Sequence, residues 1–253
     1  MSEHSPQDPI DPSEVLHQAE TLFDQCRILG MNYVSPSTRE PANQAKRPAS
    51  EMKQEWEQLT QEILNCTKCP LHLTRTHPVP GEGDLDANLV FVGEAPGFHE
   101  DQQGKPFVGR AGGLLTRMIA AMGLTREQVY ICNIIKCRPP QNRDPLPDEI
   151  AACHDWLDRQ IALIKPKMIV TLGRFSMARY FPGKSISKIH GTSLVKDGII
   201  YFAMYHPAAA LHQQKLRQTI MEDMLKIPPL LKTPGESPPA AEPPSKQLNM
   251  FEV

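Results

Sequence analysis

Between residues 87 and 225 the sequence alternates between short apolar runs and longer amphipathic stretches. Four of the apolar runs have the length of buried strands, at 87–93, 129–135, 168–173 and 199–204. Helical spacing of apolar residues predicts helices at 50–63, 111–122, 147–163 and 208–225, and another that begins at Arg174. Strands that alternate with helices predict an α/β fold, a three-layer α/β/α arrangement around a central, mostly parallel sheet.

Proline and charge divide the chain into a central domain and two flanking segments. Many of the 25 prolines fall in the first fifty residues and after Leu225. Residues 1–49 have a net charge of -3 and are predicted to be a largely flexible acidic extension, with a possible helix at 13–29. Residues 50–232 have a net charge of +3 and form the predicted domain, and residues 233–253 form a Pro-rich tail predicted to be disordered. A mildly basic domain suits contact with a few phosphates.

The sequence favours a cytoplasmic protein that is neither exported nor embedded in a membrane. No apolar run approaches 18 residues, and the first nine residues are polar. Disulfides are disfavoured in the reducing cytoplasm, where clustered cysteines more often bind metal.

Four cysteines have the spacing of such a metal site. Cys66 and Cys69 form a Cys-x2-Cys loop, and Cys137 and Cys153 can complete a set of four sulfur ligands. Cys26 and Cys132 are interpreted as small buried apolar residues. Spacing alone leaves zinc and an iron–sulfur cluster as alternatives.

Further motifs follow the first cysteine pair in a fixed order. They are GEAPG at 93–97, GKPFVGRAG at 104–112, NIIKCRPPQNRDP at 133–145, which contains Cys137, and HPAAAL at 206–211, with Cys153 before the last. From Cys66 to about Leu211 the chain resembles the family 4 uracil-DNA glycosylases. The resemblance implies a uracil-DNA glycosylase fold, a [4Fe-4S] cluster with a structural role on the four cysteines, and excision of uracil from DNA in base excision repair. It also implies a prokaryotic, nucleoid-associated enzyme, and we expect a monomer.

Such an enzyme hydrolyses an N-glycosidic bond, so it must flip the base out of the stack and stabilise the uracil anion that leaves. Phe107 is the candidate to stack on the base, Asn133 to pair with its O4 and N3–H, and His206 to donate a hydrogen bond to O2. The structural alternatives are a core aromatic residue for Phe107, a turn-forming asparagine for Asn133, and a helix-capping or hydrogen-bonded core histidine for His206.

The GEAPG loop supplies further candidates. Gly93, Ala95 and Gly97 offer backbone groups and close approach to the nucleotide. Three carboxylates, Glu94, Glu100 and Asp101, are within reach of the water by sequence. Glu94 is assigned to positioning the water or stabilising the sugar cation, and Glu100 resembles the residue that narrows the pocket against the methyl group of thymine. A solvated acidic loop is the alternative for both carboxylates.

Contacts with the rest of the DNA are expected from the motifs around Cys137 and His206. Lys136, Arg138 and Arg143 are candidates for phosphate contacts, and Leu211 for a wedge that enters the duplex. Ordinary surface charges and an apolar helix face are the alternatives.

The last residues resemble the peptide that bacterial sliding clamps bind. Gln247, Leu248, Met250 and Phe251 belong to the sequence QLNMF at 247–251, which follows a tether with seven prolines between Pro228 and Pro244. The resemblance implies a sliding clamp as a partner.

Two other classes of function compete with the enzyme. A redox protein built on the cluster would carry further cofactor motifs, and no GxGxxG follows a predicted strand. A non-catalytic DNA-associated protein of the same fold would not need Phe107, Asn133 and His206 together.

Overall fold

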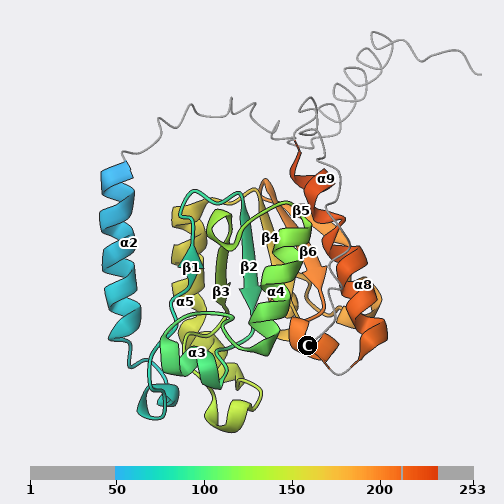
Figure 1. The fold of residues 1–253 in the computed structure, drawn as a ribbon. Helices are drawn as coiled ribbons and strands as arrows, with labels where there is room; N and C mark the ends of the chain where they lie inside the picture. The colour runs from blue at the N-terminus through green and yellow to red at the C-terminus, as the bar shows by residue number, and fades with distance from the viewer. Residues whose placement is uncertain (1–48, 212, 233–253) are drawn as a thin grey trace, which may run out of the picture. The chain divides into compact units, whose positions relative to one another are not determined.

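The computed structural model describes residues 49–211 and 213–232, which form one sheet between two layers of helices (Figure 1). The possible helix at 13–29 and the tail peptide at 247–251 lie outside the described residues. The layered α/β/α arrangement predicted from the sequence is confirmed.

Within residues 49–211 and 213–232 the sheet has six strands, in the order β1-β3-β2-β4-β6-β5. The central strands run parallel, with β3 (Tyr130–Asn133) next to β2 (Leu89–Gly93), then β4 (Met168–Leu172) and β6 (Ile199–Met204). Two short strands, β1 (Glu82–Gly83) and β5 (Ser193–Lys196), pair antiparallel at the edges. The sheet is therefore mostly parallel, as predicted.

Alternate residues of each strand face opposite helical layers. Val90 and Val92 of β2 pack with the layer that contains α2 (Ala49–Leu64), α5 (Pro147–Ile164) and α6 (Arg174–Tyr180). Leu89 and Phe91 pack with the opposite layer, which contains α4 (Arg110–Ala121), α8 (Gln214–Met224) and α9 (Ile227–Leu231). No helix in the described part of the chain is long and apolar enough to cross a membrane.

The connections contain shorter elements. They are the helices α3 (Phe98–Gln103) and α7 (Ile186–Ile189) and the 3-10 turns η1 (Pro70–Leu73), η2 (Arg126–Gln128), η3 (Pro140–Asn142) and η4 (Pro207–Leu211). The single helix predicted over 208–225 is wrong, because the chain forms η4 first and α8 begins only at Gln214. The Arg217 side chain donates to the carbonyls of Ala210 and Leu211, which a continuous helix would pair with backbone amides.

Three loops that contain predicted site residues begin at the carboxyl ends of parallel strands. β2 leads into residues 94–97, β3 into the loop before η3, and β6 into His206. In parallel sheets ligands bind at this edge.

Candidate functional site

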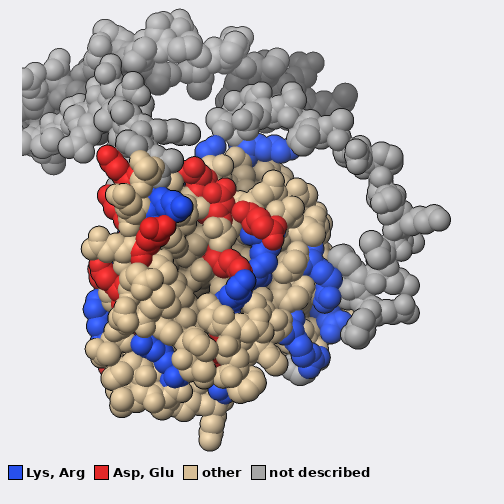
Figure 2. All heavy atoms as spheres, turned by 60° about the vertical axis from the view of Figure 1, so that its left-hand side comes forward, with Lys and Arg blue, Asp and Glu red and all other residues tan. Residues whose placement is uncertain are grey.

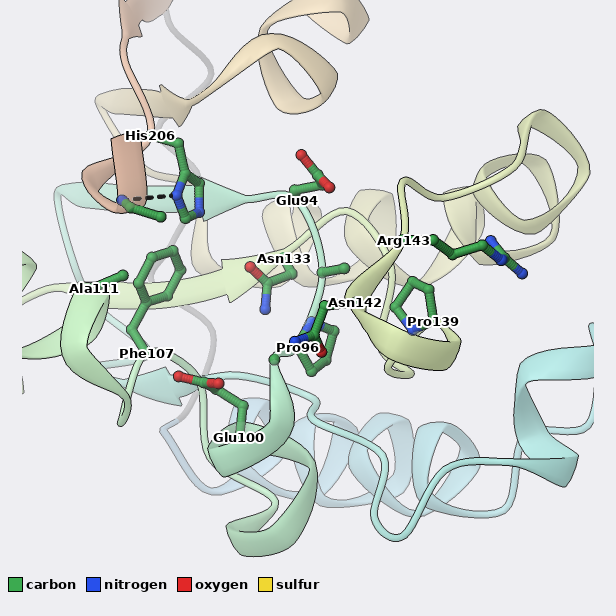
Figure 3. A pocket seen from close by; sticks show the side chains of 13 residues that line it. Glu94, Pro96, Glu100, Phe107, Ala111, Asn133, Pro139, Asn142, Arg143 and His206 are labelled. Atoms are coloured by element: carbon green, nitrogen blue, oxygen red, sulfur yellow. Dashed lines mark hydrogen bonds between the residues drawn. The ribbon is translucent and has the colours of Figure 1, made fainter. Parts of the chain in front are cut away.

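A pocket of about 400 Å³ lies at the carboxyl ends of the parallel strands β2, β3 and β6. Its lining includes seven of the residues predicted for the site, Glu94, Ala95, Gly97, Glu100, Phe107, Asn133 and His206, together with Arg143, which was predicted to contact DNA. Figure 3 shows the rings of Phe107 and His206 next to each other, with Asn133 and Glu100 turned toward the same space. Residues from Glu94 to His206, which are far apart in the sequence, therefore meet at one site.

Five lining residues were not singled out from the sequence, namely Pro96, Ala111, Pro139, Asn142 and Ala208. All five belong to the motifs quoted above. The motif as a whole could have indicated them as pocket residues, whereas their individual residue types could not. Four of them are small or apolar and shape the walls.

Gly93 lies directly against the side chains of Asn133 and Phe107. A Cβ atom there would come within 2.3 Å of Asn133 Oδ1 and 2.7 Å of Phe107 Cζ. Only glycine lets these two side chains lie so close to the end of β2.

Phe107 and His206 form one wall of the pocket. Their ring centroids are 5.6 Å apart with an angle of 28° between the planes. The Phe107 ring is only 6% exposed, and its backbone has a φ of +51°, in the left-handed region. A planar apolar face next to an imidazole suits a flat, polar ligand such as a nucleobase.

His206 is neutral near pH 7, because burial lowers the pKa of the imidazole to about 4, although the nearby Glu100 opposes this shift. The backbone N–H of Ala208 donates a hydrogen bond to His206 Nδ1 at 3.1 Å (Figure 3). Since Nδ1 accepts, the proton of the neutral ring is on Nε2. His206 thus offers a neutral N–H donor.

We expect a titration of His206 with a midpoint of about 4 and an Nε2–H tautomer above it, measured by nitrogen NMR of the ring. The folded pKa lies below the ordinary value of 6.5, so the unfolded chain takes up this proton first. The stability that His206 contributes is therefore complete above about pH 6.5 and is lost as the pH falls toward 4. A midpoint near 6.5 would contradict the assignment of a neutral donor.

Asn133 ends β3 and is 1% exposed. Its Oδ1 atom has no hydrogen-bond partner among the residues that the structure describes. An unpaired buried acceptor costs about 1–3 kcal/mol, which a ligand donor can offset. The amide is therefore ready to pair with a polar ligand edge.

The two glutamates of the pocket have different surroundings. Burial, and then the charge of Asp144, raise the pKa of Glu94, while Arg174 opposes the shift. Glu100 Oε1 instead accepts the backbone N–H groups of Val108 and Gly109, at 2.9 and 2.8 Å. Glu94 is thus the carboxylate that is available for proton chemistry, whereas Glu100 also holds the loop after Phe107.

Lys136 does not contact DNA as the sequence suggested, because its side chain is buried and only 1% exposed. Its Nζ donates to the carbonyl of Asn133 at 2.8 Å and to Gln160 Oε1 at 2.6 Å. Gln160 in turn donates to the carbonyl of Pro80 and to the hydroxyl of Tyr130. The expected phosphate contact is therefore corrected to a buried support beneath the end of β3.

Arg138, Arg143 and Leu211 stay candidates for DNA contacts. Arg138 Nε donates to Asn142 Oδ1 at 2.7 Å, and Arg143 forms two hydrogen bonds with the Glu149 carboxylate, at 2.9 and 2.6 Å. Leu211 ends η4 and is partly buried against the core.

The four predicted ligand cysteines line one small cavity, and Lys136, whose Nζ donates to the carbonyl of Asn133, lines it with them. Arg75 Nη1 lies 3.0 Å from Cys137 Sγ, and the backbone N–H of Lys136 lies 3.4 Å from Cys153 Sγ. Burial raises the pKa of the thiols of Cys69 and Cys137, and that of Cys153 to about 11. The described cysteines are all free thiols, and the described side chains include no group of three or more His, Cys, Asp or Glu spaced to hold a metal ion.

Comparison with known proteins gives a consistent result. The family model described as "Uracil DNA glycosylase superfamily" matches residues 80–226. A type-4 uracil-DNA glycosylase of Sulfurisphaera tokodaii is 52% identical over 188 residues, which cover 70% of this chain and 86% of the relative. That of Thermotoga maritima is 45% identical over 182 residues, covering 70% of this chain and 95% of the relative. A type-5 enzyme of Pyrobaculum aerophilum is only 27% identical over 180 residues, 58% of this chain and 79% of the relative. With almost the whole length of its type-4 relatives matched at about half of the aligned positions, the chain belongs to the uracil-DNA glycosylase superfamily.

Proposed function

We propose that this protein hydrolyses the N-glycosidic bond of uracil in DNA, releases free uracil and leaves an abasic site for base excision repair. The convergence of Phe107, Asn133 and His206 on one pocket carries the proposal. The names of the type-4 relatives support it. The same convergence argues against a redox protein or a non-catalytic DNA-associated protein, because neither needs these three groups together.

The pocket has the parts that recognise a flipped uracil. The base enters after it has left the stack, and its face lies against Phe107. The Asn133 amide then donates to O4 and accepts from N3–H, which would satisfy the unpaired Oδ1. Cytosine presents the opposite pattern at this edge, so a fixed amide discriminates against it.

His206 stabilises the leaving uracil anion. As the glycosidic bond breaks, negative charge gathers at O2, and the neutral Nε2–H donates to it. A neutral imidazole gives this hydrogen bond without the cost of burying a charged ring.

Glu94 positions the water and stabilises the cationic sugar. Its raised pKa makes the carboxylate a stronger base than an exposed glutamate. Glu100 narrows the pocket on the side where thymine carries its methyl group and keeps the loop at Val108 and Gly109 in place.

We expect Glu94→Gln to lower the rate of uracil release by about 100-fold, because the amide can neither take a proton nor stabilise a cation. KM should change little, since the two side chains have the same shape. Single-turnover excision from a uracil oligonucleotide measures the rate, with Glu57→Gln on the exposed face of α2 as the control. A rate within about threefold of wild type would remove Glu94 from the mechanism.

We also propose a [4Fe-4S] cluster on Cys66, Cys69, Cys137 and Cys153. The described side chains form no group that could hold a single metal ion, but the four thiols line one cavity, and Arg75 and the Lys136 backbone N–H supply donors toward sulfur, which supports a larger cluster there. When bound, the cluster would cross-link the segment after α2, the loop after β3 and helix α5. The backbone N–H of Lys136 donates to Cys153, and its Nζ donates to the carbonyl of Asn133. Lys136 therefore links the proposed cluster site to Asn133, the residue proposed to pair with the base.

Cys153→Ser should lose the bound iron and lower the midpoint of thermal unfolding by about 10 °C or more, since the cross-link within the domain is broken. Iron and sulfide analysis and a thermal melt measure the two effects. Cys132→Ala is the matched control, because this buried thiol belongs to the core and not to the cavity. Equal iron content in Cys153→Ser and wild type would refute the proposed ligand.

Arg143 at the wall of the pocket and Arg138 next to it in the sequence motif are proposed to meet phosphates, and Leu211 is proposed to enter the duplex. Figure 2 shows basic and acidic side chains interspersed on one face, with a broad uncharged area between them. Two phosphate contacts predict that DNA binding depends only modestly on salt.

The tail residues Gln247, Leu248, Met250 and Phe251 are proposed to bind a sliding clamp. The apolar side chains of a QLNMF peptide on a Pro-rich tether support the proposal. The test compares clamp binding by the full chain and by a chain that ends at residue 246. Excision from free oligonucleotides should be the same for both, and equal clamp binding by both would end the proposal.

A further inference from the structure

The backbone around Phe107 is held from two sides by charged side chains. The carbonyl of Phe107 accepts a hydrogen bond from Arg126 Nη1 at 3.1 Å, and the carbonyl of Pro106 accepts one from Arg126 Nη2. On the other side, Glu100 accepts the N–H groups of the next two residues. Four consecutive residues, 106–109, are thus fixed between a guanidinium and a carboxylate.

This segment needs support because Phe107 adopts a φ of +51°. A left-handed backbone at a residue other than glycine costs about 1–3 kcal/mol and persists only when its surroundings hold it. The carbonyl of Phe107 also faces Gly112 of α4, where a Cβ atom would come within 1.8 Å of it. If the backbone relaxed to negative φ, the ring would leave its place against Gly93 and His206.

Arg126 is itself held in place. Its side chain is 16% exposed, and Nε and Nη2 each lie 3.4 Å from Glu82 Oε2 of the edge strand β1. The turn η2 that carries it is closed by a capping box between Thr125 and Gln128. The planar fork of a guanidinium can serve two neighbouring carbonyls and a carboxylate at once, which the single ammonium of lysine cannot do with the same geometry.

We propose that Arg126 is a positioning residue for base stacking. It does not line the pocket, and it acts by holding the Pro106 and Phe107 carbonyls so that the aromatic ring stays where the face of the base must lie. The inference rests on the stacking role proposed for Phe107. It assigns a role in substrate binding to an arginine outside the motifs that identify the family.

A double-mutant cycle tests whether Arg126 acts through Phe107. We expect Arg126→Met, which keeps much of the length but removes the donors, to lower kcat/KM for uracil excision about 10-fold. In a Phe107→Leu background, where no aromatic ring remains to be positioned, the same change should cost less than about twofold. Arg126→Lys should fall between wild type and Arg126→Met.

Lys105→Ala is the matched control. Lys105 Nζ pairs with the same carboxylate, 3.3 Å from Glu82 Oε1, but no hydrogen bond joins it to either carbonyl. Its kcat/KM should equal that of wild type. All variants are assayed below their measured unfolding transitions, so that lost stability is not counted as lost stacking.

Each outcome bears on a different claim. An equal loss from Arg126→Met in both backgrounds, or a loss below about twofold in the wild-type background, overturns the positioning role. If Phe107→Leu alone leaves kcat/KM unchanged, the stacking role of Phe107 fails and the inference fails with it. Excision by the wild-type protein remains a separate measurement that neither result alters.

Discussion

Replacing His206 with alanine should lower the rate of uracil release by about 100- to 1,000-fold, the usual effect of removing one donor from a developing oxyanion. The neutral Nε2–H is the donor that the structure offers for O2, and Ala208 fixes it by occupying Nδ1. The loss should appear in the chemical step, because charge at O2 grows only as the bond breaks. Affinity for uracil-containing DNA should change far less.

Single-turnover kinetics separate the two effects, and a competition assay with uncleaved DNA measures affinity. His154→Ala is the matched control, since this histidine lies exposed on α5 and pairs with Asp158. If His206→Ala lost its activity through weaker DNA binding alone, the role in stabilising the leaving group would be refuted.

Replacing Gly93 with alanine should abolish productive binding of the base and lower kcat/KM by about 100-fold or more. The added Cβ would lie 2.3 Å from Asn133 Oδ1 and 2.7 Å from the Phe107 ring, so both groups that read the base must move. A displacement of about 1 Å at such positions is enough for a loss of this size.

Gly113→Ala provides the comparison for this variant. Gly113 lies in α4, where an added Cβ meets nothing within 4 Å, and alanine there should stabilise the helix by about 0.5–1 kcal/mol without affecting excision. Thermal melts and steady-state kinetics of both variants provide the test. Near-normal kcat/KM in Gly93→Ala would mean that the base does not lie between Asn133 and Phe107.

The elements that the sequence predicted well are those whose pattern is local. β6 was predicted with its observed bounds, Ile199–Met204, because a six-residue apolar run that follows Asp197-Gly198 and precedes Tyr205-His206-Pro207 has few alternatives in a parallel sheet. The pocket residues followed from motifs at strand ends. The edge strands β1 and β5 were missed, since two and four residues leave little periodic signal.

The features that the sequence could not reveal depend on distant partners. Lys136 looked like a surface charge near DNA until the fold placed Gln160, 24 positions away, against its Nζ. Nothing in the sequence pointed to a role for Arg126, because its partners Glu82, Pro106 and Phe107 come together only in the folded protein. The break between η4 and α8 likewise depends on a tertiary contact, since the Arg217 side chain donates to the carbonyls of Ala210 and Leu211. It could not be predicted because the helical spacing of apolar residues continues across it.

The order of the strands has a consequence during synthesis on the ribosome. β6 pairs with β4 inside the sheet, yet it is among the last elements to be made, and His206 follows it directly. Before this part of the chain has been made, a nascent chain contains Phe107 and Asn133 but lacks His206, the donor that stabilises the leaving uracil anion. Meanwhile the unpaired edge of β4 is exposed and open to pairing with another chain. The last third of the domain therefore both completes the enzyme and closes the sheet against aggregation.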